Sequence, residues 1–229
     1  MNTTTILRQA ENLASDEEKL MLLGDFIGEN LDSLEAMDLI RLLSPLVDIT
    51  RRIYEQNPVQ ETISDYVTAL IKLAENYIRD ERSWLAMPLL AKAEELLDDQ
   101  PDTEENAQWK CHSYYDIGEC YSMNTRRLMA KKAFQKALQH ATTEDDKENC
   151  EYNLNRLENP SLKYDPVEDS DAYLSVIDEV ERRLYEQLKG EPRYMGFCFR
   201  YWSAKRDLLA EYGIEWRSPG IMNPRVVFD

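Results

Sequence analysis

The chain has 229 residues, of which 43% are hydrophobic and 31% are charged, so it is long enough to bury a core in one domain or two. Its formal net charge of −17 repels nucleic-acid phosphates and anionic lipid headgroups. The composition therefore argues against a nucleic-acid partner and against docking on a membrane.

The sequence predicts a cytoplasmic location. The N-terminal segment has neither a basic start nor a continuous apolar stretch, and no apolar run approaches the roughly 20 residues that cross a bilayer. The 4 cysteines are scattered without a CxxC pair, which is typical of reduced, buried thiols.

The first part of the chain predicts three helices. A short helix is expected over residues 3–14. Ser15 and Glu18 have the spacing of a capping box, so a second helix should begin there. Ser33 is expected to cap a third helix, which Pro45 kinks or restarts and which ends near Gln56.

The middle of the chain predicts five more helices with short turns between them. Thr143 begins a capping motif for the last of these, and Pro88 should kink the second or mark its late start. The expected ranges are about 60–79, 81–97, 103–123, 125–141 and 143–157.

The C-terminal part predicts two further helices. Ser170 is expected to cap a helix that Gly190 and Pro192 end, and a last helix should run over about residues 193–212. Beyond Gly213 the chain has two prolines and several large apolar residues, so we expect an extended, non-helical tail.

These elements predict an all-α fold in three parts. Residues 1–158 should form a helical region, and residues 159–169, which contain prolines and lack apolar periodicity, should form a linker. Residues 170–229 should form a helical hairpin with its tail, packed on the helical region. From Pro192 onward basic residues outnumber acidic ones, so this segment should be attracted to the acidic remainder of the chain.

The tail is expected to act as a strap. The last predicted helix is apolar on two faces, and both must be covered. We expect the tail to cover one of them through Trp216, Arg217, Ile221, Met222, Arg225 and Phe228. The alternative is that the strap ends in an acidic groove, where Arg217 and Arg225 would face acidic residues. In a groove of its own chain it would block that groove, and in a groove of a second copy it would form a swapped homodimer.

Residues 111–144 carry a pattern of large and small residues that spans two helices. Small residues are needed where antiparallel helices approach closely, and Gly118 is expected to face Ala130. The spacings resemble a tetratricopeptide repeat, a helix hairpin of about 34 residues. The matching residues are Tyr114, Ile117, Gly118, Tyr121, Ala130, Phe134 and Ala137.

The same pattern fits residues 67–100 well and residues 17–50 weakly, but does not extend into the C-terminal third. Gly24, Ala74 and Gly118 are equivalent and lie 50 and 44 residues apart. Tandem copies would be about 34 apart, so the connections should be longer and the stack distorted. The second copy has Leu70, Leu73, Ala74, Tyr77, Ala86, Leu90 and Ala93, and the weak copy has Leu20, Leu23, Gly24, Ile27, Ala36, Ile40 and Leu43.

The resemblance implies a solenoid of antiparallel helix hairpins that binds a protein or peptide in a concave groove lined by the first helix of each repeat. Its carboxylates would favour a basic partner. The Lys and Arg residues with which one subgroup grips the carboxylate tails of chaperones are replaced here by Glu75, Tyr115 and Glu119, which excludes that function. By position, the groove would consist of Asp25, Thr68, Ile71, Glu75, Ile78, Arg79, His112, Tyr115, Glu119 and Ser122.

The sequence carries no motif for catalysis. HExxH, GxGxxG, P-loop and GxSxG patterns do not occur, and His112 and Cys120 are spaced about 12 Å apart on a helix, too far to share a metal. We therefore expect a non-enzymatic scaffold without metal or cofactor. Two alternatives are an acidic inhibitor or immunity-type protein that neutralises a basic effector, and a helical enzyme whose carboxylate cleft the sequence does not reveal.

Overall fold

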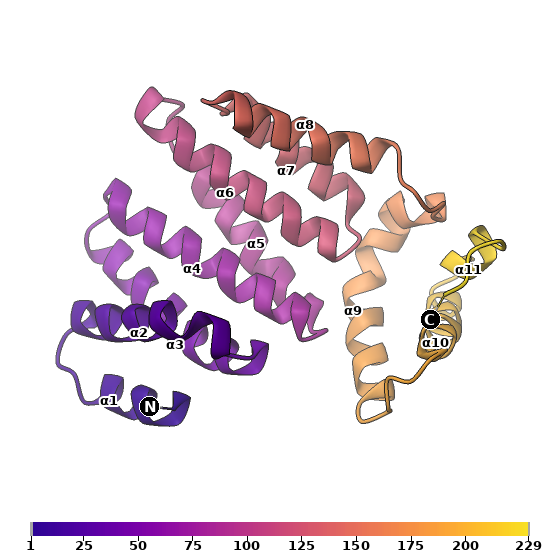
Figure 1. Cartoon of the computed structure of the whole chain (residues 1–229), viewed down its shortest axis with the longest axis horizontal. Coiled ribbons are helices and arrows are strands. Elements are labelled where there is room, and N and C mark those ends of the chain that lie inside the picture. The colour runs from indigo at the N-terminus through magenta and orange to yellow at the C-terminus, as the bar shows by residue number, and fades with distance from the viewer. Residues whose placement is uncertain (1, 229) are drawn as a thin grey trace.

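The computed structural model describes residues 2–228, and this part of the chain is all-α, without a strand, as predicted (Figure 1). Two 3-10 turns, Leu31–Ser33 and Pro166–Asp169, lie between longer helices. The helices are α1 (Thr3–Glu11), α2 (Asp16–Asn30), α3 (Ala36–Gln56), α4 (Gln60–Arg79), α5 (Ser83–Asp98), α6 (Glu104–Met123), α7 (Arg127–Gln139), α8 (Glu144–Glu158), α9 (Asp171–Leu188), α10 (Phe197–Glu211) and α11 (Pro219–Met222).

Side-chain caps start several helices where the sequence predicts them. Ser15 Oγ accepts from the backbone N–H of Glu18, whose carboxylate accepts from the N–H of Ser15. Thr143 caps α8 in the same way, and Ser170 caps α9. Each cap satisfies backbone donors that have no partner within the helix, so these starts are fixed by local chemistry.

Other helix starts differ from the predictions. The hydroxyl of Ser33 donates to the carbonyl of Asn30 instead of capping a helix, because a 3-10 turn intervenes and α3 begins after Glu35. Pro45 and Pro88 lie inside α3 and α5, and neither helix restarts at its proline.

The C-terminal elements also differ. The last long helix begins at Phe197 rather than near residue 193, because Gly196 adopts a positive φ of 84° just before it. The tail is not wholly extended either. Pro219–Met222 forms a single helical turn that Ser218 caps, and Pro219 fits at its start because a proline needs no N–H partner there.

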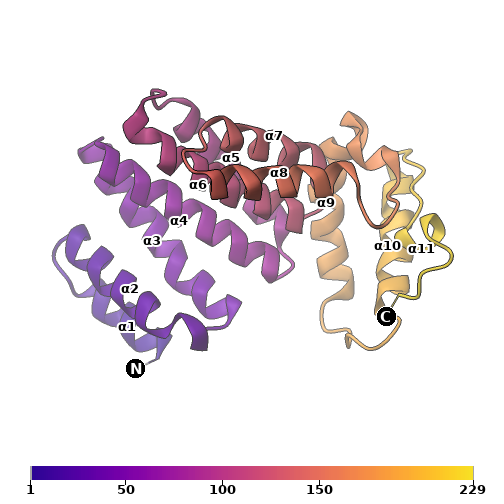
Figure 2. The ribbon, with the colours of Figure 1, turned by 45° about the horizontal axis from the view of Figure 1, so that its top comes forward.

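Helices α1 to α8 pack one after another in chain order, and α9 and α10 lie at one end of this stack (Figure 1). In Figure 1, α4 packs between α3 and α5, α6 pairs with α7, and α4 and α6 lie side by side. One hydrophobic core joins α1 to α8, and a second forms between α9, α10 and the residues after α10. α9 contacts α5 at the end of the stack, and α10 lies beyond it (Figure 2).

The hairpins α4–α5 and α6–α7 share the same turn. Glu81 and Thr125 adopt positive φ angles of 60° and 55°, which are uncommon for residues other than glycine. In each turn the next residue donates its N–H to the carbonyl of a tyrosine, at 2.8 Å for Arg82 and 2.9 Å for Arg126. Ala74 precedes Glu81 by as many positions as Gly118 precedes Thr125, so the pattern residues and the turns keep the same register in both hairpins.

Gly118 marks a close approach of α6 and α7, but its partner is not the predicted one. A Cβ built on Gly118 would lie 2.7 Å from a ring carbon of Phe134, whereas Ala130 is not among its nearest neighbours. Gly24 in the weak copy is exposed, and a Cβ there would meet nothing within 4 Å. The close helix contact therefore exists around Gly118 and not around Gly24.

Replacing the two glycines by alanine should have opposite effects. Gly118→Ala should lower the free energy of unfolding by about 1–3 kcal/mol, because the added methyl overlaps the Phe134 ring. Gly24→Ala is the matched control and should raise it by about 0.5–1 kcal/mol, because alanine favours a helix interior. Urea denaturation followed by circular dichroism measures both, and equal stability of the two variants would contradict the close contact.

Candidate functional site

The predicted groove residues do not form one continuous surface. Ile71 is only 3% exposed and belongs to the core, so it cannot line a groove. His112 and Tyr115 face α8, where His112 Nε2 lies 3.3 Å from Asp146 Oδ1 and Asn153 Nδ2 donates to the Tyr115 hydroxyl at 2.9 Å. α8 packs against the hairpin that precedes it and partly covers Tyr115, whereas His112 stays exposed at the edge of this contact.

A half-buried carboxylate lies among the solvent-facing residues of the predicted groove. Glu75 accepts from Arg79 Nη2 at 2.5 Å and from Lys72 Nζ at 3.3 Å, so neighbours on its own helix partly neutralise it. The residues of the predicted groove that are exposed are Asp25, Thr68, Arg79, His112 and Glu119. Together with Glu75, Glu119 gives α4 and α6 an acidic strip, which we define by these two residues.

Two residues of the predicted groove, Ile78 and Ser122, lie near the C-terminal ends of α4 and α6. Ser122 lines a small hollow beside α8 together with Arg127 and Tyr152. Ile78 lines a different and larger pocket, which the C-terminal hairpin closes. Of the predicted groove, only Ile78 reaches this pocket.

Asp116 is a half-buried acid near Lys72, Glu75 and His112. Burial raises the pKa of its carboxyl above the ordinary aspartate value, and Glu75 adds to this shift. Lys72 and His112 oppose it by attraction. Keeping the Asp116 carboxylate charged in the folded state therefore costs free energy.

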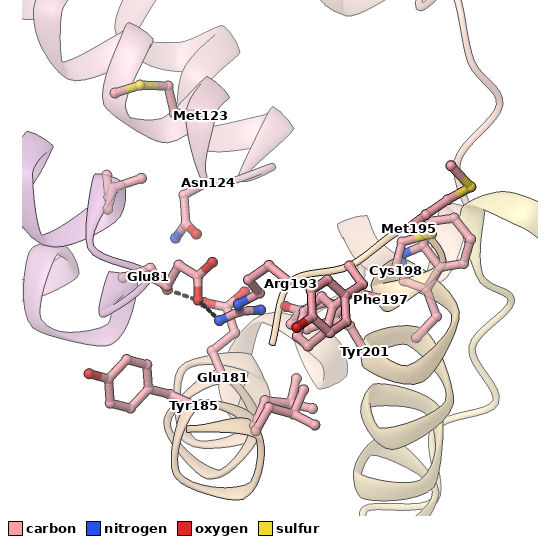
Figure 3. A pocket seen from close by; sticks show the side chains of 16 residues that line it. Glu81, Met123, Asn124, Glu181, Tyr185, Arg193, Met195, Phe197, Cys198 and Tyr201 are labelled. Carbon is pink, nitrogen blue, oxygen red and sulfur yellow. Dashed lines mark hydrogen bonds and ion pairs between the residues drawn. The ribbon is translucent and has the colours of Figure 1, made fainter. Parts of the chain in front are cut away.

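The larger pocket has a volume of about 810 Å³ and lies where the ends of α4 and α6 meet α9, α10 and the loop that joins them (Figure 3). Ile78 and Met123 line it from the helix ends, and Glu81 and Glu181 supply carboxylates. Its aromatic side is formed by Tyr185, Tyr194, Phe197, Tyr201 and Trp202. Aromatic faces beside carboxylates are the surroundings that cationic groups prefer.

A polar network reaches this pocket, which we call the hairpin pocket, through Ser83 and Glu181. Glu181 of α9 accepts a hydrogen bond from the Ser83 hydroxyl, at the start of α5, and lies 3.4 Å from Arg126 Nη2. Arg126 is 3% exposed and also donates to Asp178 Oδ1 at 2.6 Å. The two equivalent turns thus converge on one carboxylate and hold α9 against the ends of the hairpins.

Arg193 lies across the mouth of the hairpin pocket. Its guanidinium stacks over the Phe197 ring, 4.0 Å from the ring centroid, and forms an ion pair with Glu81. Figure 3 shows this side chain extending from the α9–α10 loop toward Glu81, with Glu181 close by. The loop lies between Gly190 and Gly196, which adopt positive φ angles of 81° and 84°.

The tail is tied to the linker and to α10. Trp216 is 4% exposed, and its Nε1 donates to Glu168 at 2.7 Å. The backbone N–H of Arg217 donates to Asp165 at 2.7 Å, and its side chain also pairs with Asp165. Arg217 therefore does not face the acidic strip.

The remaining strap residues differ in how far they are covered. The rings of Phe228 and Trp202 meet edge to face, 5.0 Å apart. Met222 is half-buried, whereas Ile221 and Arg225 are exposed. The tail thus covers the Trp202 side of α10 only in part.

The described residues hold no group suited to bind a metal ion. Between residues 2 and 228 no three side chains of His, Cys, Asp or Glu gather in a way that could hold a metal ion. Within the same residues, no helix has the length and apolar character needed to span a bilayer. Burial raises the pKa of Cys111 and Cys120 to about 12, which keeps both thiols protonated at neutral pH.

Comparisons with family models, with curated proteins and with solved structures found no match to this chain.

Most residues of the hairpin pocket were missed because they come from distant parts of the sequence. Glu81 lies in the turn after α4 and Glu181 in α9, and no short motif connects them. One signal did point to the region, since the last helix is apolar on two faces. Phe197 and Tyr201 on one face line the pocket, as the need for a cover on that face would suggest.

Removing the buried arginine should loosen α9 from the hairpins. Arg126→Met should lower the free energy of unfolding by roughly 3–5 kcal/mol, because Glu181 would stay buried without a cation. Arg82→Met is the matched control at the equivalent turn position and should cost less, about 1 kcal/mol, since Arg82 contacts Asp80, the Tyr77 ring and Met37 rather than α9.

Chemical denaturation measures these changes, and Arg126→Met/Glu181→Leu should recover much of the loss because it removes both buried charges. Equal losses for the Arg126 and Arg82 variants would contradict the role of the network.

Asp116 should make stability depend on pH. Its folded pKa lies above the unfolded value, so the folded state holds more protons between the two values and stability falls as pH rises through that window. Asp116→Asn should therefore raise the melting temperature at neutral pH, with a gain that shrinks toward acid pH.

Asp146→Asn provides a control of opposite sign. The hydrogen bond from the Thr143 hydroxyl lowers the pKa of Asp146, so its stabilisation is present above the ordinary aspartate pKa and lost as pH falls. Melting curves of both variants between about pH 4 and about pH 7 test these expectations, because this range runs from the ordinary pKa of a carboxyl group to neutrality. A lower melting temperature for Asp116→Asn at neutral pH would be the contrary result.

Proposed function

We propose that this chain is a non-enzymatic interaction scaffold of tetratricopeptide-like repeats that binds a basic peptide or protein segment. The repeat interpretation is supported by the shared turns after α4 and α6. It is also supported by burial, since the pattern residues of both better copies are buried, apart from the half-buried Tyr77. Large residues at these positions fill the space between neighbouring hairpins, as in a solenoid.

A basic ligand is favoured by the character of the candidate surfaces. The acidic strip, Glu75 and Glu119, runs along the two first helices, and the hairpin pocket lies at their ends. The observation that carries the proposal is that this pocket combines aromatic rings with carboxylates around a guanidinium. The net charge of −17 would speed the approach of a basic partner.

A pair of double variants with the same net charge tests the strip. Glu75→Lys/Glu119→Lys reverses it, whereas Glu95→Lys/Asp99→Lys reverses two exposed carboxylates at the end of α5. We expect wild type and the α5 variant to bind a fluorescent pool of basic peptides equally at about 0.15 M salt, where interactions beyond about 8 Å are screened. The strip variant should bind at least tenfold more weakly, as expected from a local change of about 1.4 kcal/mol or more.

Fluorescence anisotropy measures the affinities, and circular dichroism checks that all the proteins are folded. Neutral and acidic peptide pools should not bind. Equal losses in the two double variants would mean that only total charge matters, and equal binding by all three proteins would remove the strip from the site.

A further inference from the structure

We propose that the hairpin pocket is a binding site for an arginine side chain of the partner, and that the chain's own Arg193 occupies it until the partner displaces it. This inference rests on the proposed function, because it names the group that a basic partner would insert.

The chemistry of the pocket is specific for a guanidinium. A planar, delocalised cation stacks on an aromatic face while it pairs with carboxylates at its edge, which a compact ammonium does less well. Arg193 does both, because it stacks on Phe197 and pairs with Glu81. Glu181 lines the same pocket.

The hold on Arg193 is weak enough to be released. The side chains of Arg193 and Glu81 are 46% and 56% exposed, and ion pairs so open to water contribute little to stability. Arg193 sits on a short loop between two glycines with positive φ, at which the backbone can change direction without a Cβ clash.

The hairpin pocket is large enough to hold more than the Arg193 side chain, and exposed apolar side chains lie beside it. Its volume of about 810 Å³ is that of a typical ligand site. Beside Arg193, Tyr194 and Met195 are 76% and 88% exposed, so the loop presents large apolar side chains to solvent. A partner segment that seats its arginine could cover both, and the exposure of two adjacent large side chains would then be explained.

The test uses N-acetyl-arginine amide as the probe and the full chain as the receptor. Methyl NMR signals of methionine report the place of binding, because Met123 and Met195 line the pocket and Met21 lies on α2 far along the chain. Titrations compare wild type with Arg193→Ala, which vacates the site. Arg206→Ala is the matched control, since it removes an exposed arginine of α10 whose contacts are with Asp207 and Ser203 of the same helix.

We expect Arg193→Ala to bind the probe more tightly than wild type, by about tenfold if Arg193 fills the site nine-tenths of the time, while Arg206→Ala matches wild type. The shifts should fall on Met123 and Met195 and leave Met21 unchanged. The neutral isostere N-acetyl-citrulline amide should not bind, the lysine analogue should bind more weakly, and Glu81→Gln in the Arg193→Ala background should weaken binding again.

Equal affinity of wild type and Arg193→Ala would overturn the displacement, and equal binding of the arginine and citrulline probes would overturn the guanidinium site. Shifts at Met21 as large as those at Met123 would do the same. These outcomes are separate from a failure of the proposed function, because the acidic strip is tested with peptides and with variants that leave Glu81 and Arg193 intact.

Discussion

The carboxylate of Glu181 is the contact on which the arrangement of the C-terminal half depends. It takes hydrogen bonds from Ser83 and Arg126, which stand at the ends of two separate hairpins. Ser83 follows the turn after α4 and Arg126 lies in the turn after α6, so both turns contribute to the same point on α9. A buried carboxylate without these partners would be costly, so the network favours this one position of α9 over others.

The pocket follows from that position. Once α9 is held against α5, near the ends of α4 and α6, the returning α10 leaves a space that aromatic side chains line but do not fill. Opposite charges across the junction support the arrangement, since Arg193 pairs with Glu81 and Arg217 pairs with Asp165. Arg193, Arg200 and Arg217 pair with acidic residues earlier in the chain, in line with the charge distribution. Arg206 pairs instead with Asp207 of the same segment.

Features determined by local chemistry could be predicted from the sequence. The bounds of α4 and the caps at Ser15, Thr143 and Ser170 depend on residues within one turn of each other, and all agree with the structure. Ser33 has the right chemistry for a cap, but a 3-10 turn uses it instead, and residues close in sequence do not decide between the two.

The candidate site could be predicted only in small part, because it depends on contacts between distant residues. Ile71 was expected at the surface but lies in the core, since the helix orientation relative to its neighbours is set by packing. Tyr115 was expected to be open but is covered by α8. The pairing of Arg193 with Glu81 joins residues more than a hundred positions apart, and only a structure brings them together.

The most direct test of this account is native-state hydrogen exchange along the whole chain at increasing denaturant. If Glu181 joins the C-terminal hairpin to the hairpins α4–α5 and α6–α7, amides of residues 177–184 in α9 should open with the same free energy and the same denaturant dependence as those of α6 and α7. Opening of α9 and α10 at a clearly lower free energy, while α6 and α7 stay protected, would contradict the claim that this contact makes the two parts one cooperative unit.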